Sequence, residues 1–247
     1  TNRPVVDLTL ALNYALGKLD VAGYHLVNLV IHLGAAILLF LIFRFSFERI
    51  SKPPIQDKNP FLLAWLAATL WAVHPLQTES VTYTIQRSES LMGLFYLLTI
   101  YAVIRSAIYQ NRGWGIAAIV SCLLGMATKE VMMTAPIITL IYDRLYLAKN
   151  FRETFRRRGW IYAGMALSWI LLFYLTNVSR QNATNAGVSL PGVSPFTYAL
   201  AQQKVISHYL KLALWPTNLC FDYSWGLPTI TDILPSLCLI TILISLS

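Results

Sequence analysis

Residues Leu26–Phe43 read LVNLVIHLGAAILLFLIF, an apolar run of 18 residues without a single Lys, Arg, Asp or Glu. A run of this length and composition is typical of a helix that crosses a membrane. Further apolar blocks follow along the chain: Phe61–Val73, Leu91–Ile104, Trp114–Ala127, Val131–Leu147, Trp160–Leu175 and Ile233–Leu246. Several are shorter than the roughly 20 residues that span hydrocarbon, but flanking Trp, Tyr and polar residues can complete a crossing inside a bundle.

The overall composition favours the same class of protein. Hydrophobic residues make up 56% of the chain and charged residues 12%, whereas an ordinary soluble domain carries about 25% charged residues. A soluble protein with an all-helical core is the weaker alternative. We therefore expect an all-α integral membrane protein, built as a polytopic helix bundle.

The basic residues indicate how the bundle is oriented. Segments 44–60, 105–113 and 144–159 hold 12 of the 19 Lys and Arg residues. The positive-inside rule places these segments in the cytoplasm, so the net charge of +8 is mostly a topology signal. Arg156–Arg158 are expected to contact membrane lipid headgroups. Because no aromatic residues are interleaved with these cations on a soluble surface, no nucleic-acid partner is expected.

Three polar clusters lie at the other ends of the apolar blocks, at His74–Glu79, Gln86–Glu89 and Thr128–Glu130. When the chain is threaded through a bilayer, all three fall on the side opposite the basic segments. Ionisable groups at membrane depth are costly, so a set gathered on one face suggests a functional site. The sequence therefore predicts a polar cavity that opens on the non-cytoplasmic face.

The cations near these clusters are Arg87, Lys129 and Arg3. Arg offers bidentate donors to phosphate oxygens and Lys acts as a point charge, so the three are predicted to bind a phosphate or pyrophosphate. The alternative is contact with lipid headgroups, or pairing with Glu79, Glu89 and Glu130. The phosphate role is favoured for Arg87, because its neighbours are polar, and both roles stay open for Arg3.

Two carboxylates, Glu79 and Glu130, are predicted to act as general base, metal ligand or hydroxyl orienter. A carboxylate in a low-dielectric cavity is costly unless it is paired or functional. The alternative is ion pairing, for example of Glu130 with Lys129 or Arg87. Helical spacing from Thr78 to Ser90 predicts that Glu79, Tyr83 and either Gln86 or Arg87 share one helix face.

The histidines do not favour a metal site. His25 and His32 are seven residues apart, too far for two helical ligands to one ion, and no Cys, His or Asp cluster surrounds them. Hydrogen bonding between helices is the preferred role for His32. His25, Asn28 and His74 are predicted to line the cavity, and no metal-ligating residue is assigned.

Two further segments stand outside the apolar blocks. Residues 4–17 place Val5, Leu8, Leu12 and Leu16 on one face and predict an interfacial helix. Residues 177–232 predict a long outer loop that contains an amphipathic helix, Tyr198–Trp215. The chain begins without Met and ends inside an apolar run, so we expect a piece of a longer protein, incomplete at both ends.

These residues also resemble a known family. The matching segments, in chain order, are Arg3-Pro4, Leu12–Tyr14, Gly23–Asn28, His32, His74–Val81, Arg87–Leu91, Lys129-Glu130, Pro136, Tyr142–Arg144, Trp215-Pro216 and Asp222-Tyr223. They are similar to the transmembrane O-mannosyltransferases that modify cadherins and to bacterial relatives that carry tetratricopeptide repeats. Thr128–Leu145 resembles the bacterial branch more closely.

The resemblance implies the C-type glycosyltransferase fold and a polyprenyl-phosphate sugar donor bound in an outer-facing cavity. It adds Asp222 and Tyr223 to the residues expected to line that cavity. It also implies a catalytic carboxylate in a first outer loop, which together with the first helix would precede Thr1, and a repeat domain after the bundle. Residues 1–247 would then hold the phosphate-binding part of the site. A divalent metal stays open as a cofactor.

The preferred hypothesis is a membrane glycosyltransferase that passes a sugar, mannose or a similar hexose, to a protein hydroxyl. Its expected location is the bacterial inner membrane, with the endoplasmic reticulum membrane as the alternative. A second hypothesis is a non-catalytic subunit that keeps the fold and acts as a scaffold in a larger membrane complex. A transporter is less favoured, because no internal repeat or broken helix pair is visible.

Overall fold

The computed structural model describes residues 3–50, 59–182 and 195–220. The chain falls into two units, Thr1–Asn182 and Ala183–Ser247. All the regular structure of the described residues is helical, which confirms the predicted all-α class. The helices of the first unit are α1 (Pro4–Gly17), α2 (Val21–Ile50), α3 (Pro60–Ala72), α4 (Thr78–Thr82), α5 (Arg87–Tyr109), α6 (Arg112–Met126), α7 (Ala135–Tyr146) and α8 (Phe151–Asn182).

Three segments are long and apolar enough to cross a membrane: Val21–Ile50, Thr84–Tyr109 and Phe151–Asn177. Each contains one of the predicted apolar blocks, and the first extends Leu26–Phe43 at both ends. A fourth crossing is formed if Pro60–Ala72 and Pro75–Thr82 count as one span bent by 55°. The helix α3 has its N-cap at Asn59, whose side chain accepts a hydrogen bond from the Phe61 amide. The chain is an integral membrane protein.

The remaining predicted spans differ from the structure. Trp114–Ala127 lies in α6, which has only 15 residues. Val131–Leu147 is not one helix, because a 3₁₀ segment, η4 (Glu130–Thr134), precedes the 12-residue α7. Proline is favoured in the first turn of a helix, where its missing amide costs nothing, and Pro136 stands there in α7. The predicted span Ile233–Leu246 lies outside the described residues.

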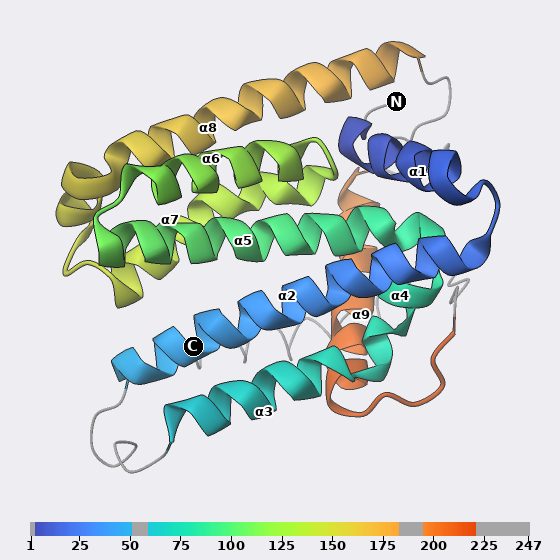
Figure 1. Ribbon diagram of the computed structural model, residues 1–247, viewed down its shortest axis with the longest axis horizontal. Helices are drawn as coiled ribbons and strands as arrows, with labels where there is room; N and C mark the ends of the chain where they lie inside the picture. The colour runs from blue at the N-terminus through green and yellow to red at the C-terminus, as the bar shows by residue number, and fades with distance from the viewer. Residues whose placement is uncertain (1–2, 51–58, 183–194, 221–247) are drawn as a thin grey trace. The chain divides into compact units, whose positions relative to one another are not determined.

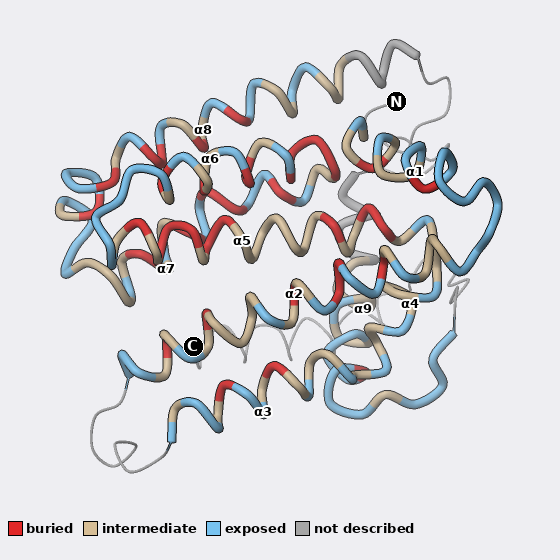
Figure 2. Tube along the Cα trace, viewed as in Figure 1, coloured by how far each residue is buried: buried red, intermediate tan, exposed pale blue. Residues whose placement is uncertain are grey.

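The long helices of the first unit run side by side, and helices that follow one another in the chain alternate in direction (Figure 1). α2 packs against α3 and α5, α5 against α6, and α6 against α8, while α7 contacts α5 and α8. Buried positions concentrate where α5, α6, α7 and α8 meet, and α2 and α3 are mostly exposed or half-buried (Figure 2). The main apolar core accordingly joins side chains from these four helices, with Val103, Cys122, Met126 and Met165 at its centre.

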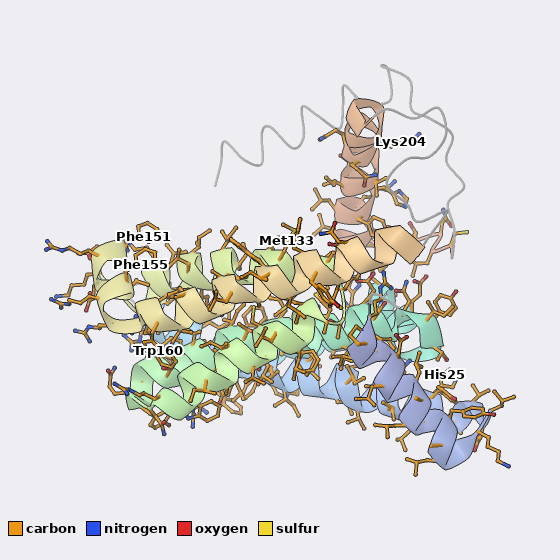
Figure 3. All side chains as sticks on the ribbon, turned by 90° about the horizontal axis from the view of Figure 1, so that it is seen from above. His25, Met133, Phe151, Phe155, Trp160 and Lys204 are labelled. Atoms are coloured by element: carbon orange, nitrogen blue, oxygen red, sulfur yellow. The ribbon has the colours of Figure 1, made fainter. Side chains whose placement is uncertain are left out.

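Because consecutive helices alternate in direction, the basic segments and the three polar clusters lie at opposite ends of the bundle. α2, α5 and α7 end, and α3, α6 and α8 begin, at the end that carries the basic segments (Figure 1). The other end holds α1, the turn between α3 and α5, and the turn between α6 and α7. In Figure 3, His25 lies at this second end, far from Phe151, Phe155 and Trp160. The three polar clusters therefore share one end of the bundle.

The two segments predicted outside the spans are also helical. α1 covers Pro4–Gly17, as the spacing of its apolar residues predicts. In the second unit, α9 (Pro195–Leu214) contains most of the predicted amphipathic helix. The predicted outer loop was to begin at Asn177, but α8 continues to Asn182. Residues 183–194 and 221–232 of that loop lie outside the described residues.

Candidate functional site at the polar end of the bundle

Arg87 is fully buried at the first turn of α5 and joins three helices. Its Nε donates to Asn28 Oδ1 at 2.7 Å, and its Nη1 donates to Asn13 Oδ1 at 2.6 Å. It also donates to the backbone carbonyls of Thr9 at 3.3 Å and Tyr24 at 3.1 Å. These partners come from α1 and α2 and are all neutral. The contacts favour a structural role, and the predicted phosphate role of Arg87 stays a prediction.

Arg87→Met is expected to destabilise the bundle by at least about 2 kcal/mol, because it leaves buried oxygens without donors and each unsatisfied group costs about 1–3 kcal/mol. Unfolding by denaturing detergent measures the change. Arg112→Met is the matched control, since Arg112 is exposed at the start of α6. If Arg87 instead holds a phosphate, Arg87→Met will keep its stability and lose ligand binding.

A second charged group forms where the turn after α6 meets the start of α5. Lys129 Nζ makes an ion pair with Glu89 Oε1. One residue earlier on α5, Ser88 accepts a hydrogen bond from Arg3 Nη1 at 3.3 Å. The backbone amide of Val5 donates to the carbonyl of Ala127 at 3.4 Å, which ties the start of α1 to the end of α6. Arg3 and Lys129, both predicted phosphate ligands, are therefore held at the same place.

Burial and a neighbouring cation both act on the charge of Lys129. Burial lowers the pKa of its ammonium, the positive charge of Arg3 lowers this pKa further, and Glu130 opposes the shift. The Lys129 side chain is 22% exposed, and the Arg3 Nε is buried without a hydrogen-bond partner. A phosphate beside these cations would accept a hydrogen bond from Arg3 Nε and would compete with Glu89 for Lys129.

The two predicted catalytic carboxylates lie in different surroundings. Glu130 opens η4 directly after Lys129 and is half-buried. Glu79 lies on α4 and accepts a hydrogen bond from Gln86 Nε2 at 3.3 Å. The predicted helix face shared by Glu79, Tyr83 and Arg87 is wrong, because the chain leaves the helical conformation at Tyr83 (φ −105°, ψ 109°). Glu79 is therefore not aligned with Arg87 along one helix.

The residues predicted to line a cavity mostly bind the backbone of the α3–α5 turn. His25 Nδ1 and Asn28 Nδ2 both lie within hydrogen-bond distance of the Val81 carbonyl, at 3.2 and 3.3 Å. His74 Nδ1 accepts from the Leu76 amide at 3.2 Å and caps η2 (Pro75–Gln77). His32 Nε2 contacts the Ala72 carbonyl at 2.9 Å, the interhelical bond predicted for it. Asp222 and Tyr223 lie outside the described residues.

A cavity of about 590 Å³ opens between α2, α3 and α5. Most of its wall is apolar, with Ala35, Leu39, Phe43, Trp71 and Leu97 among the contacting side chains. Four of its polar lining residues come from the polar end of the bundle, Gln77, Ser80, Glu89 and Ser90, and two more, His32 and Tyr96, lie on α2 and α5. Glu89 thus belongs both to the cavity wall and to the ion pair with Lys129, whereas Lys129 and Arg3 are not among the residues that line the cavity. His25, Asn28 and His74 do not line it.

Glu89 is the residue that sequence reasoning underrated, as it entered only as a pairing partner. Its position in the polar cluster at the start of an apolar block was the signal that could have singled it out. Among the described residues, no three His, Cys, Asp or Glu side chains gather as a metal site. The arrangement suits an amphiphile, with an anionic head beside Lys129 and Arg3 and an apolar body along the cavity.

Comparison with curated proteins shows which proteins the chain resembles in sequence. The chain is 28% identical over 228 residues to the protein O-mannosyl-transferase F38B6.6 of Caenorhabditis elegans, covering 91% of this chain and 30% of the relative. It is 28% identical over 267 residues to human TMTC4, named in the same way, covering 94% of this chain and 36% of the relative. The chain is thus similar in sequence to proteins named protein O-mannosyl-transferases. The predicted resemblance to the transmembrane O-mannosyltransferase family is confirmed.

The similar region covers most of this chain but only part of each relative. Drosophila melanogaster Tmtc3, another protein O-mannosyl-transferase, is 31% identical over 166 residues, covering 61% of this chain and 18% of the relative. The chain spans about a third of the length of the first two relatives. No family model matches the chain. No solved structure matches it.

Proposed function

We propose that the chain forms part of a membrane glycosyltransferase domain that transfers mannose or a similar hexose from a polyprenyl-phosphate donor to a protein hydroxyl on the non-cytoplasmic face. The single observation that supports it most is that Glu89, which lines the polar end of an apolar cavity, is ion-paired with Lys129, beside the hydrogen bond from Arg3 to Ser88. The names of the relatives support the sugar and the protein acceptor.

The chemistry assigns distinct tasks to the cations and the carboxylates. The acceptor oxygen attacks the anomeric carbon, the bond from that carbon to the phosphate oxygen breaks, and the lipid phosphate leaves with its negative charge. Lys129 and Arg3 stabilise that charge as it develops. The acceptor hydroxyl gives its proton to a carboxylate. The family resemblance expects this base upstream of Thr1, and Glu79 or Glu130 would orient the acceptor.

The orientation follows from the separation of charges in the bundle. The basic segments gather at the end opposite the site, and such segments face the cytoplasm in most membrane proteins. The proposed donor site then opens on the non-cytoplasmic face. The bacterial inner membrane, with the endoplasmic reticulum membrane as the alternative, stays the predicted location.

A transfer assay on the full-length protein in lipid nanodiscs tests this function. Mannose transfer to a cadherin-type acceptor domain is expected from polyprenyl-phosphate mannose and not from a nucleotide-linked mannose. The physical reason is that a nucleotide has no apolar tail for the cavity. Transfer from the nucleotide sugar alone would contradict the proposal, and so would the absence of transfer from either donor.

A further inference from the structure

A second hollow, separate from the cavity of the candidate site, lies between α7 and α8. It has a volume of about 410 Å³, and residues of both helices line it, among them Leu140 on α7 and Phe155, Gly159, Ala163 and Trp169 on α8. None of the described residues that line this α7–α8 groove is charged. An occupant of the groove therefore meets an uncharged wall.

The aromatic side chains of the groove have their polar atoms bound elsewhere. The Tyr162 hydroxyl, on a residue that also lines the groove, donates to Asp143 Oδ2 at 2.7 Å. Trp169 Nε1 donates to the Met133 carbonyl at 3.0 Å. The two rings thus offer dispersion contacts to an occupant, and their hydrogen-bond donors are already used. This wall suits a hydrocarbon chain.

The groove runs along α8 from the basic end of the bundle. Phe151 and Phe155 lie at that end, and Met133 lies farther along the bundle (Figure 3). The α8 lining extends from Phe155 to Trp169, which is about 21 Å at 1.5 Å per helical residue. The acyl chains of one leaflet cover about 15 Å, half of the roughly 30 Å of bilayer hydrocarbon. The groove is long enough for one such chain.

Arginines lie on the same faces of α7 and α8 as the groove lining. On α8, Arg152 and Arg156 precede Gly159 at helical spacing, so the three residues share one face. On α7, Arg144 follows Leu140 by four residues and shares its face in the same way. The basic end of the groove is therefore flanked by cations from both helices.

These three arginines differ from their neighbours in pairing. Arg157 and Arg158 each form an ion pair with an acidic residue of the bundle, at 3.0 and 2.5 Å. Arg144, Arg152 and Arg156 form no ion pair with any residue that the structure describes. Arg152 and Arg156 are also exposed. An anion at this end of the groove would thus meet guanidinium groups that no carboxylate of the described residues occupies.

We propose that the α7–α8 groove binds one anionic glycerophospholipid, with its phosphate at Arg144, Arg152 and Arg156 and one acyl chain along Gly159 and Ala163. Charge complementarity selects this occupant, because its anionic head meets the arginines and its hydrocarbon meets the uncharged wall. A partner helix would have to bring acidic residues to the basic end of the groove. The site lies at the end opposite the candidate site, and the inference does not depend on the proposed function.

The double variant Arg152→Gln with Arg156→Gln tests the headgroup contacts. Phosphatidylglycerol is titrated into the full-length protein in detergent, and native mass spectrometry measures the bound fraction. Binding should weaken about thirtyfold, since each basic residue near an anionic headgroup contributes about fivefold. Arg157→Gln is the matched control, because Arg157 is paired with Glu153, and it should bind phosphatidylglycerol as the wild type does.

Gly159→Leu tests the acyl chain. A Cβ at this position meets only Phe155 Cβ, at 4.0 Å, so the new side chain enters the groove. The variant should fold, because Leu is a better helix former than Gly. Phosphatidylglycerol binding should weaken about tenfold, the loss expected when about two methylenes lose their contacts. Gly93→Leu is the matched control, since it makes the same change in α5, where a Cβ meets no atom within 4 Å.

Two further probes identify which part of the lipid is bound. Phosphatidylcholine has the same chains and no net charge, and the wild type should bind it more weakly than phosphatidylglycerol. Glycerol phosphate has the head without the chains and should show no measurable binding. Equal wild-type affinity for the two phospholipids would overturn the anionic headgroup, and tight binding of glycerol phosphate would overturn the acyl chain.

The same variants decide between a lipid and a helix as the occupant. Unchanged phosphatidylglycerol binding in either folded variant, the double arginine variant or Gly159→Leu, would contradict the proposal. If Gly159→Leu instead converts a dimer to a monomer and leaves lipid binding unchanged, the groove holds a helix of a second copy, and the lipid assignment is wrong.

Discussion

Lys129→Met is expected to lower the rate of mannose transfer by about a hundredfold in the full-length protein. Removing one group that stabilises developing charge in a dry site costs about 10²–10³ in rate. Lys129 is part-buried and paired with Glu89, so little water is available to replace its ammonium. Steady-state kinetics with polyprenyl-phosphate mannose measure the effect, which should appear mainly in kcat/KM.

Two further variants distinguish the lost attraction between Lys129 and the donor phosphate from a new repulsion between Glu89 and that phosphate. Lys129→Met also leaves the Glu89 carboxylate facing the donor phosphate. The double variant Lys129→Met with Glu89→Gln should therefore bind the donor more tightly than Lys129→Met alone. Lys149→Met removes a cation from the opposite end of the bundle and should leave transfer unchanged. An unaltered kcat/KM in the folded Lys129→Met variant would remove Lys129 from the site.

Asp143→Ala is expected to destabilise the bundle by about 3–5 kcal/mol, because it leaves a buried guanidinium without its carboxylate. Asp143 on α7 is fully buried and Arg158 on α8 is 5% exposed. Arg158 Nη2 and Nε donate to the two carboxylate oxygens at 2.5 and 2.7 Å. Tyr162 adds a hydrogen bond from its hydroxyl at 2.7 Å. This network fixes α7 to α8 at the end opposite the candidate site.

Unfolding by denaturing detergent, followed through tryptophan fluorescence, measures this loss. The exposed pair between Arg44 Nε and Glu48 Oε1, 2.9 Å long and about half exposed, is the control. Glu48→Ala should cost no more than about 0.5 kcal/mol. Asp143→Leu combined with Arg158→Met should be far less damaging than Asp143→Ala alone, because it removes both charges. A loss below about 1 kcal/mol in Asp143→Ala would show that the pair contributes little.

The sequence predicted the class of the fold because that class depends on composition and on the length of apolar runs. Leu26–Phe43 lies inside α2, and the clusters around His74, Arg87 and Lys129 share one end of the bundle. These inferences need only the alternation of apolar blocks and charged segments. The bond from His32 to the carbonyl of Ala72 was also predicted in kind, because a polar group inside a bundle requires a partner.

The sequence did not predict where short helices break. Helical spacing placed Glu79, Tyr83 and Arg87 on one face, but the same spacing is produced by two short helices separated by an extended residue at Tyr83. Val131–Leu147 is apolar enough for one span, yet η4 occupies its beginning. The spacing of residues along the sequence does not reveal that a single residue interrupts a helix.

Contacts between residues far apart in the sequence were the second feature that the sequence could not predict. Arg87 binds Asn13, 74 residues away in the chain, and no local pattern indicates that an amide from the first helix satisfies this guanidinium. Sequence reasoning offered the pairing of Lys129 with Glu89 only as one alternative to phosphate binding, because that pairing depends on how the α6–α7 turn meets α5. Because of these contacts, we favour Lys129 and Arg3 over Arg87 as the cations of the candidate site.

In the proposed mechanism, Lys129 holds the phosphate of a polyprenyl-phosphate lipid. Solid-state NMR dipolar recoupling between ³¹P of bound polyprenyl phosphate and ¹⁵Nζ-labelled lysine tests it most directly, in the full-length protein in lipid bilayers. We expect a ³¹P–¹⁵N coupling at direct-contact distance that persists in Lys149→Met and disappears in Lys129→Met. A coupling that survives Lys129→Met, or no lysine coupling to the bound lipid in the wild type, would contradict the account.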